Sequence, residues 1–201
     1  MKLIIATNNQ GKVREIKQML EPLGYEPISL KDAGIDINVV EDGDSFEENS
    51  HLKAKAVYDI CHCPVIADDS GLEVDFLDGA PGIYSARYAG ENATDEQRIQ
   101  KILDELDGVD TSMRAARFVC AMYAILDDDT EYSVRGTLEG FIGTEPLGEN
   151  GFGYDPIFMV DEDTSVAMLP AEEKNRIRHR ANALKQLTEI LSENTQKEER
   201  E

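Results

Sequence analysis

The sequence predicts an α/β fold, and two patterns carry the prediction. Near the N-terminus, an apolar run over residues 2–7 precedes an amphipathic stretch from Val13 to Leu23, as when a buried strand leads into a helix. Later, residues 115–126 and 131–142 form two strand-like runs around the acidic turn 127–130, which is typical of a long β-hairpin. With 201 residues and 41% apolar content, the chain can bury a substantial core, in one compact domain or in two lobes that share a sheet.

The charge of the chain limits its partners. The 41 acidic and 20 basic residues give a formal net charge of −21. Proteins that track a phosphate backbone carry basic stripes, so we expect no nucleic acid polymer as a partner. A small phosphorylated ligand is compatible with this charge, because a few cations that converge in a cleft outweigh a distant acidic exterior. The acidic surface itself fits either solubility or a salty cytoplasm.

The N-terminal apolar run is too short for a secretion signal, and no later segment approaches membrane-spanning length. We therefore expect a cytoplasmic protein with no membrane partner. The chain has three cysteines, and Cys61-His62-Cys63 falls short of a zinc pattern because no second ligand pair stands elsewhere. We interpret this motif as reduced thiols between a helix and a strand.

A polar loop, Thr7-Asn8-Asn9-Gln10-Gly11-Lys12, joins the first strand to the first helix. A helix N-terminus presents free backbone N–H groups and a positive dipole end, and Lys12 adds a full charge, so the loop is suited to hold an anion. It is not a Walker A loop, because the early glycine is missing and Val13 follows the lysine. The alternative is an ordinary helix cap by Asn8 or Asn9.

An acidic helix start follows. Two further short strands are predicted before it, at residues 25–30 and 35–40. Ser45 and Glu48 have the spacing of a capping box, which begins a helix over residues 46–60. Glu41 lies ahead of the cap and is free to reach toward the end of the next strand. Alternatively, the acidic cluster only marks a helix start that the dipole favours.

The next strand, residues 64–74, carries Asp68-Asp69-Ser70-Gly71 at the end of its apolar run. Adjacent side chains on a strand point to opposite faces, so we expect Asp68 and Asp69 to have different roles. No Lys or Arg stands beside them in sequence, and a hard divalent cation with oxygen ligands is the natural partner. The alternative is a strand that runs into an Asp-Ser-Gly turn.

Two loops in the second half suit ligand binding. A glycine- and proline-rich loop over residues 77–90 precedes a helix that Thr94 or Asp95 caps and that runs through Leu106. In the second loop, residues 148–158, glycines bracket aromatic residues, so backbone and rings can approach a flat ligand closely. Alternatively, this loop is a tight turn whose aromatics pack in the core.

A final helix is predicted from Pro170 through Leu191, with a polar tail from about Glu193. Its first half concentrates positive charge on an acidic chain, through Lys174, Arg178 and Arg180. His179 lies among them and can donate a hydrogen bond to a carbonyl or phosphate oxygen.

Taken together, these segments resemble the non-canonical purine nucleoside triphosphate pyrophosphatases, the inosine/xanthosine triphosphatase family. The resemblance rests on six motifs in order along nearly the whole chain: Thr7–Lys12, Ser45–Asn49, Ala67–Gly71, Ala80–Tyr88, Gly151–Pro156, and Glu173-Lys174-Asn175 with His179-Arg180. It implies an elongated mixed β-sheet flanked by helices, with two lobes and a central active-site cleft. It also implies one two-lobed domain over residues 1–192, a polar tail over 193–201, and a homodimer.

The resemblance further implies an activity and a site. The activity is Mg²⁺-dependent hydrolysis of ITP, dITP or XTP to the monophosphate and pyrophosphate, which cleanses the nucleotide pool. Glu41 and Asp69 would hold the metal, and Asp69 would accept the proton, with Asp68 as the competing base because a metal-bound carboxylate is weakly basic. The implied substrate contacts are Thr7, Asn8, Asn9, Gln10, Gly11, Lys12, Lys53, Ser70, Phe152, Gly153, Tyr154, Asp155, Lys174, His179 and Arg180.

The chain departs from the family pattern at two positions. Arg178 stands where the family usually has Ser, and Met168 stands where Glu is common. The first change keeps open a related pyrophosphatase with other or broader dNTP specificity. A nucleotide-binding module without turnover is the third hypothesis, although the acidic residues and Lys12 argue against it.

Overall fold

The computed structural model describes residues 1–198, and the chain divides into two compact units. Unit 1 comprises residues 1–69, residues 120–136 and the chain from Arg180 onward. Unit 2 comprises Ser70–Val119 and Thr137–His179. The division falls within long strands, directly after Asp69 in one of them.

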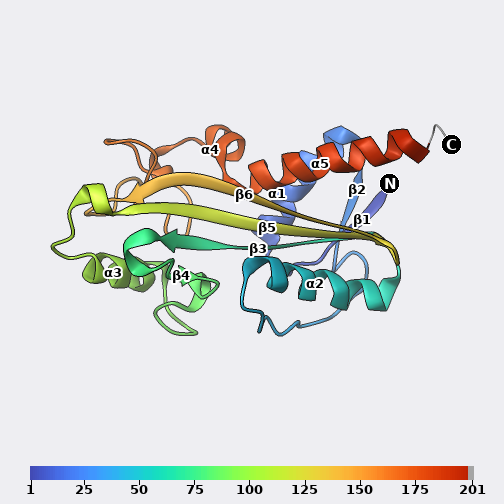
Figure 1. Cartoon of the computed structure of the whole chain (residues 1–201), viewed down its shortest axis with the longest axis horizontal. Coiled ribbons are helices and arrows are strands. Elements are labelled where there is room, and N and C mark those ends of the chain that lie inside the picture. Colours follow the sequence, from blue (N-terminus) through green and yellow to red (C-terminus); the bar gives the residue numbers. More distant parts are fainter. Residues whose placement is uncertain (199–201) are drawn as a thin grey trace. The chain divides into compact units, whose positions relative to one another are not determined.

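The strands form a mixed sheet (Figure 1). They are β1 (Lys2–Ile5), β2 (Glu26–Ser29), β3 (Val65–Val74), β4 (Pro81–Gly82), β5 (Ala115–Asp127), β6 (Thr130–Ile142) and β7 (Phe158–Met159). Their order is β2-β1-β3-β5-β6-β7, and β4 pairs with β3. β1 pairs parallel with β2 and β3, whereas β3 with β4 and β6 with β7 are antiparallel. The predicted mixed α/β class is therefore confirmed.

Five α-helices accompany the strands in the described part of the chain: α1 (Gln10–Leu20), α2 (Phe46–Cys61), α3 (Asp95–Glu105), α4 (Ala171–Ile177) and α5 (His179–Glu198). Their starts follow the expected chemistry. Asn9 caps α1, and Ser45 caps α2 by accepting from the Glu48 N–H. Thr94 caps α3 in a full capping box with Gln97.

Alternation along β1 separates the two faces of the sheet in unit 1. Leu3 and Ile5 pack in a core with α1 and α5, whereas Ile4 packs in a second core with α2. Figure 1 shows α1 and α5 on one side of these strands and α2 on the other. Since both faces are buried, the strand is apolar from Leu3 onward, and each fully buried aliphatic side chain stabilises the fold by about 2 kcal/mol.

Unit 2 has a core of its own. Ile99 and Ile102 of α3 pack with Leu72 of β3, and the same cluster contains Phe118 and Phe158. The rings of these two phenylalanines lie 4.4 Å apart between centroids. The aromatic residues that follow Gly148 thus contribute partly to this core, and Tyr154 is one of its buried members.

One predicted strand is absent. Residues 35–40 form no strand, although their alternating exposure matches the pattern that predicted one. Ile35 and Ile37 pack against the core on the α2 face, but none of the described strands pairs with this segment. The prediction was wrong because a segment can bury every second side chain without ladder hydrogen bonds.

The predicted final helix is two helices. α4 ends at Ile177, Arg178 is extended with φ −60° and ψ 147°, and α5 begins at His179. α5 continues to Glu198, beyond the expected end at Leu191. Residues 192–198 contain no glycine or proline to stop the helix, so the predicted polar tail is helical as far as the structure describes it.

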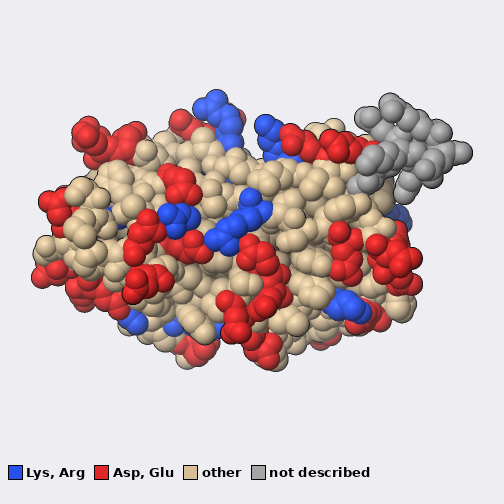
Figure 2. Space-filling view, in the orientation of Figure 1, with Lys and Arg blue, Asp and Glu red and all other residues tan. Residues whose placement is uncertain are grey.

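Acidic side chains are spread over the face shown in Figure 2, and the basic ones lie singly or in small groups among them. Across residues 1–198, the helices are all too short or too polar to cross a membrane.

Candidate active site

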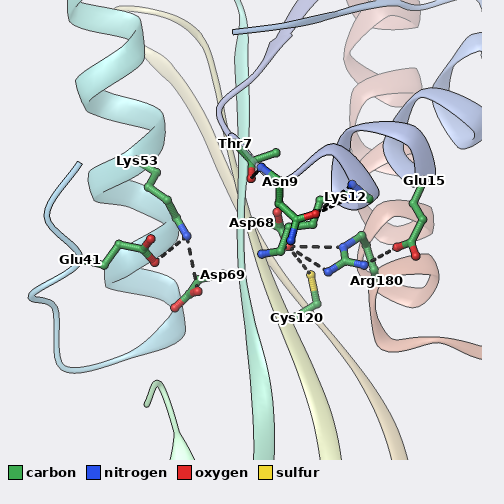
Figure 3. Close-up of polar contacts among 11 residues, drawn as sticks. Thr7, Asn9, Lys12, Glu15, Glu41, Lys53, Asp68, Asp69, Cys120 and Arg180 are labelled. Carbon is green, nitrogen blue, oxygen red and sulfur yellow. Dashed lines mark hydrogen bonds and ion pairs between the residues drawn. The ribbon is translucent and has the colours of Figure 1, made fainter. Parts of the chain in front are cut away.

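Asp68 and Asp69 lie on opposite faces of β3 within unit 1. Ile66 belongs to the core with α1 and α5, and Ala67 belongs to the core with α2. The alternation continues through the carboxylates, so Asp68 contacts groups on the α1 and α5 side and Asp69 contacts a group on α2 (Figure 3). The prediction that these two residues face different surroundings is confirmed.

Asp68 is a buried carboxylate that contacts two cations. Its Oδ2 is 2.8 Å from Lys12 Nζ and 3.4 Å from both Nε and Nη2 of Arg180. Cys120 Sγ lies 3.9 Å from the same oxygen. Arg180 also pairs with Glu15 on α1, so this guanidinium joins α5 to both α1 and β3. The side chains of Asp68 and Arg180 are 0% and 4% exposed, whereas that of Lys12 is 18% exposed, so the cluster is open to solvent only at the lysine.

The charges around Asp68 decide its protonation. Burial raises the pKa of Asp68, but the positive charges of Lys12 and Arg180 outweigh burial and hold its pKa well below the ordinary value. Burial likewise raises the pKa of the Cys120 thiol, to about 12, with the Asp68 charge adding to the effect. Asp68 is therefore a permanent anion at neutral pH and a poor proton acceptor.

Asp69 has a different environment. Lys53 Nζ on α2 lies 3.4 Å from Asp69 Oδ1 and 2.7 Å from Glu41 Oε2, so one ammonium joins the two carboxylates. Burial raises the pKa of Asp69, the charges of Lys53 and Lys12 lower it, and the neighbouring carboxylates raise it again, with a net increase. Asp69 is thus the more basic of the two aspartates, and its side chain is 13% exposed.

The carboxylates that contact Lys53 are suited to hold a hard cation that also binds a substrate. Glu41 and Asp69 offer carboxylate oxygens near one point of positive charge. Among residues 1–198, groups of three or more His, Cys, Asp or Glu placed to hold a metal ion are absent. Mg²⁺ fits such a pair, because it usually takes one or two carboxylates and completes its shell with water and substrate phosphates. By the same observation, Cys61-His62-Cys63 is not arranged as a metal site.

The loop before α1 has the geometry of a helix cap. Asn9 Oδ1 accepts from the N–H groups of Gly11 at 2.9 Å and Lys12 at 3.2 Å, and the Asn9 N–H donates to Thr7 Oγ1. Asn8 Nδ2 donates to Ile37 O. The capping alternative therefore describes the backbone of this loop, while the Lys12 side chain supplies a charge beside Asp68.

In unit 2, Asp155 joins two buried cations. Its Oδ2 is 3.2 Å from Lys174 Nζ, and it also pairs with Arg178 Nη2. Lys174 donates as well to the carbonyl of Asn150. A Cβ on Gly151, where φ is +100°, would lie 2.1 Å from Asp155 Oδ2, so only glycine fits this turn.

The loop around Asp155 is also held by residues that the sequence analysis did not include in the site. Asp95 Oδ2 accepts from the Gly153 N–H at 2.6 Å, and Asp95 pairs with Arg98. Tyr154 OH donates to the carbonyl of Ser85 at 2.8 Å. Asp95 stands in the first turn of α3, where an acidic residue is expected for helix stability alone, so its second role left no signal in the sequence.

The remaining predicted residues fall on both units. His179 stacks on Phe118, with ring centroids 5.2 Å apart and an interplanar angle of 23°. Ser70 is half-buried at the start of the unit 2 segment, and Gln10 Nε2 lies 3.5 Å from Asn8 O. Unit 1 therefore contains Thr7–Lys12, Glu41, Lys53, Asp68, Asp69 and Arg180, and unit 2 contains Ser70, Phe152–Asp155, Lys174 and His179.

The fold and this centre define a mixed α/β protein with paired carboxylates beside buried lysine and arginine. Comparison with known proteins gives the family. The chain belongs to the Ham1 family, whose model matches residues 3–190. The resemblance drawn from the six motifs is confirmed at the level of the family.

Relatives support this membership over nearly full length. The chain is 51% identical over 189 residues to a dITP/XTP pyrophosphatase of Bacillus subtilis (strain 168), with 94% of this chain and 96% of the relative covered. It is 45% identical over 195 residues to a dITP/XTP pyrophosphatase of Photobacterium profundum, with 96% and 98% covered. The solved structure of the Staphylococcus aureus Ham1 protein superposes with a TM-score of 0.88 at 44% identity, covering 96% of this chain and all of that one (100%).

Proposed function

We propose that this protein is a nucleoside triphosphate pyrophosphatase that hydrolyses dITP, ITP and XTP to the monophosphate and pyrophosphate. The observation that carries the proposal is the Asp69–Lys53–Glu41 contact, in a chain about half identical to dITP/XTP pyrophosphatases. A carboxylate beside a cation and a second carboxylate is suited to orient and deprotonate water next to a bound metal.

Asp69 is the proposed proton acceptor, and Asp68 is the proposed positioning anion. Water forms a new P–O bond at the α-phosphorus, the bond from that phosphorus to the oxygen bridging the α- and β-phosphates breaks, pyrophosphate leaves with the bridging oxygen, and the water proton passes to Asp69. Asp68 is less suited to that step, because Lys12 and Arg180 hold its pKa low and its side chain is fully buried. Its contacts instead keep Lys12 in place.

Cations supply most of the stabilisation in such a reaction. Charge disperses over the phosphate oxygens in the transition state, and nearby ammonium and guanidinium groups stabilise it. We assign the phosphates to the loop from Thr7 to Lys12, to Lys53 and to Arg180. Glu41 and Asp69 would hold a Mg²⁺ ion, which would supply further positive charge to stabilise the phosphate oxygens.

We assign the purine and the sugar to residues of unit 2. Phe152 offers an aromatic face, and the backbone of Gly153 and Tyr154 permits a close approach. Lys174, His179 and Ser70 complete the proposed contacts. Discrimination against 6-amino purines would follow if these donors bind a 6-oxo group, because the wrong base leaves a polar group without a hydrogen bond.

A nucleotide panel tests this function. The purified protein with Mg²⁺ is given dITP, ITP, XTP, ATP and GTP, with or without added inorganic pyrophosphatase, and released phosphate is measured. We expect phosphate from dITP, ITP and XTP only when pyrophosphatase is present. Phosphate without the added enzyme would indicate stepwise dephosphorylation, and tight Mg²⁺-nucleotide binding without product would indicate a binding module.

The broader dNTP specificity that Arg178 suggests is tested by adding dATP and dCTP to this panel. Arg178 contacts both Phe152 and Asp155, which are proposed base and sugar contacts. Turnover of dATP or dCTP comparable to that of dITP would establish the broader specificity.

We also propose that the protein is a cytoplasmic homodimer and that residues 1–192 act as one domain. Light scattering coupled to size exclusion tests the dimer.

A further inference from the structure

The buried side chain of Arg178 bridges two residues of the loop proposed to bind the base. Arg178 is only 6% exposed. Its Nη2 pairs with Asp155 Oδ2, and its guanidinium carbon lies 5.3 Å from the centroid of the Phe152 ring. All three residues belong to unit 2, so this arrangement is internal to one compact unit.

Arg178 stands directly after the last turn of α4. The Arg178 N–H closes the last turn of α4 by donating to Lys174 O at 3.0 Å, but its ψ of 147° ends the helix there. The φ of Arg178 is still helical at −60°, so its side chain leaves on the same face as that of Lys174, four residues earlier, and the ψ turns only the chain that follows. Lys174, one turn earlier, reaches the same carboxylate.

The loop needs such a support because Phe152 is exposed. Phe152 is 59% exposed, so packing against the core does not fix the plane of its ring. Asp155 accepts from the Phe152 N–H at 3.4 Å, which ties the backbone of the turn to the same carboxylate. A guanidinium over an aromatic face gains both cation–π and stacking contact, and its planar shape restricts the ring more than an ammonium would.

We propose that Arg178 is a positioning residue that fixes the Phe152 ring and the Asp155 carboxylate before a nucleotide binds. The proposal rests on the proposed function only for the identity of the ligand, a purine nucleoside triphosphate. A preformed aromatic platform lowers the ordering cost of binding, so its loss raises KM rather than lowering the rate of the chemical step.

The free protein provides the first test. The chain has no tryptophan, so Phe152→Trp introduces a single fluorescent reporter at the platform. Adding Arg178→Ala should lower the anisotropy of Trp emission and increase its quenching by acrylamide. The matched control is Arg176→Ala, an exposed arginine on the preceding helix. Equal anisotropy and quenching in the Arg178 and Arg176 variants would overturn the proposal.

Folding does not decide this test. Lys174 still pairs with Asp155 in Arg178→Ala, so the carboxylate keeps a cationic partner. If thermal denaturation shows that Arg178→Ala is unfolded, Arg178→Lys provides the readout, since lysine keeps the charge but lacks the planar guanidinium. We expect the Trp anisotropy of this variant to be lower than that of the parent, and anisotropy equal to the parent would overturn the proposal.

Kinetics provide the second test. Without the Trp reporter, Arg178→Ala should raise KM for dITP by about tenfold, on the scale of a misplaced contact residue, and should leave kcat nearly unchanged. A fall in kcat at constant KM would overturn the proposal. Absence of turnover in the wild-type protein would count against the proposed function alone, because the fluorescence of the free protein still decides the role of Arg178.

Discussion

Asp68 and Asp69 are neighbours in the sequence but contact different lysines, Lys12 at 2.8 Å and Lys53 at 3.4 Å. The Asp68 carboxylate is fully buried, and the Asp69 carboxylate is partly open to solvent. Because strand alternation places them in different surroundings, their pKa values shift in opposite directions: the pKa of Asp68 is lowered and that of Asp69 is raised. Two carboxylates with opposite shifts are the usual sign of a divided role.

The first prediction separates the two roles by mutation. Asp69→Asn should lower kcat by roughly a thousandfold with the fold intact, as expected for loss of a general base. Asp68→Asn should destabilise the protein by about 3 kcal/mol, because it removes the buried anion that pairs with the buried Arg180 and the partly buried Lys12. Activity assays with dITP and urea unfolding of both variants provide the measurements. Full activity in Asp69→Asn together with an inactive, stable Asp68→Asn would reverse the assignment.

The second prediction concerns stability as a function of pH. The pKa of Asp69 is higher in the folded than in the unfolded protein. The contribution of Asp69 to the free energy of unfolding is therefore fully present below the unfolded pKa and is lost as pH rises through the folded pKa. Asn carries no such charge. Asp69→Asn should therefore gain thermal stability relative to wild type as pH rises from about 4 to neutrality. Melting temperatures over this range test the sign, and a relative loss would contradict it.

The third prediction tests whether the Thr7–Lys12 loop holds phosphates or only caps α1. Asn9→Asp preserves the cap, because Asp and Asn are equally good in that position, but it adds a negative charge near the proposed phosphates. We expect KM for dITP to rise by roughly tenfold from charge repulsion, with little change in melting temperature. Asn92→Asp, an exposed asparagine in unit 2, is the control for net charge. An unchanged KM would mean that the loop caps α1 and does not hold the phosphates.

The fourth prediction concerns the metal. Chelation with EDTA should abolish turnover, and added Mg²⁺ should restore it. Glu41→Gln should raise the Mg²⁺ concentration for half-maximal activity by about tenfold, because it removes one carboxylate ligand. Asp42→Asn, at the exposed neighbouring position, should not change that concentration. Equal Mg²⁺ dependence in the two variants would remove Glu41 from the metal site.

Most elements of the fold could be predicted from the sequence, since they follow from local periodicity and cap chemistry. The hairpin of β5 and β6, the helix after Ser45 and the capped helix after Thr94 are examples. The failures lie where local pattern and pairing diverge. Residues 35–40 alternate without a partner strand, and the helix predicted through Arg178 breaks there although no glycine or proline marks the break.

The sequence predicted which residues belong to the site, but it did not predict which partners they contact. Both the anion loop and the capping alternative were compatible with Thr7–Lys12, and the structure has the Asn9 cap. Glu15 and Asp95 were missed because each fits an ordinary helical position. Their partners, Arg180 and the Gly153 N–H, are 165 and 58 residues away along the chain.

The sequence by itself determined the class of the fold, the order of the motifs, and the placement of Asp68 and Asp69 on opposite faces, because strand alternation is a local property of the backbone. Only the tertiary structure decided which cation each carboxylate meets, and hence which aspartate is the stronger base. A pKa depends on burial and on charges within a few ångströms, and folding brings those charges from remote parts of the chain.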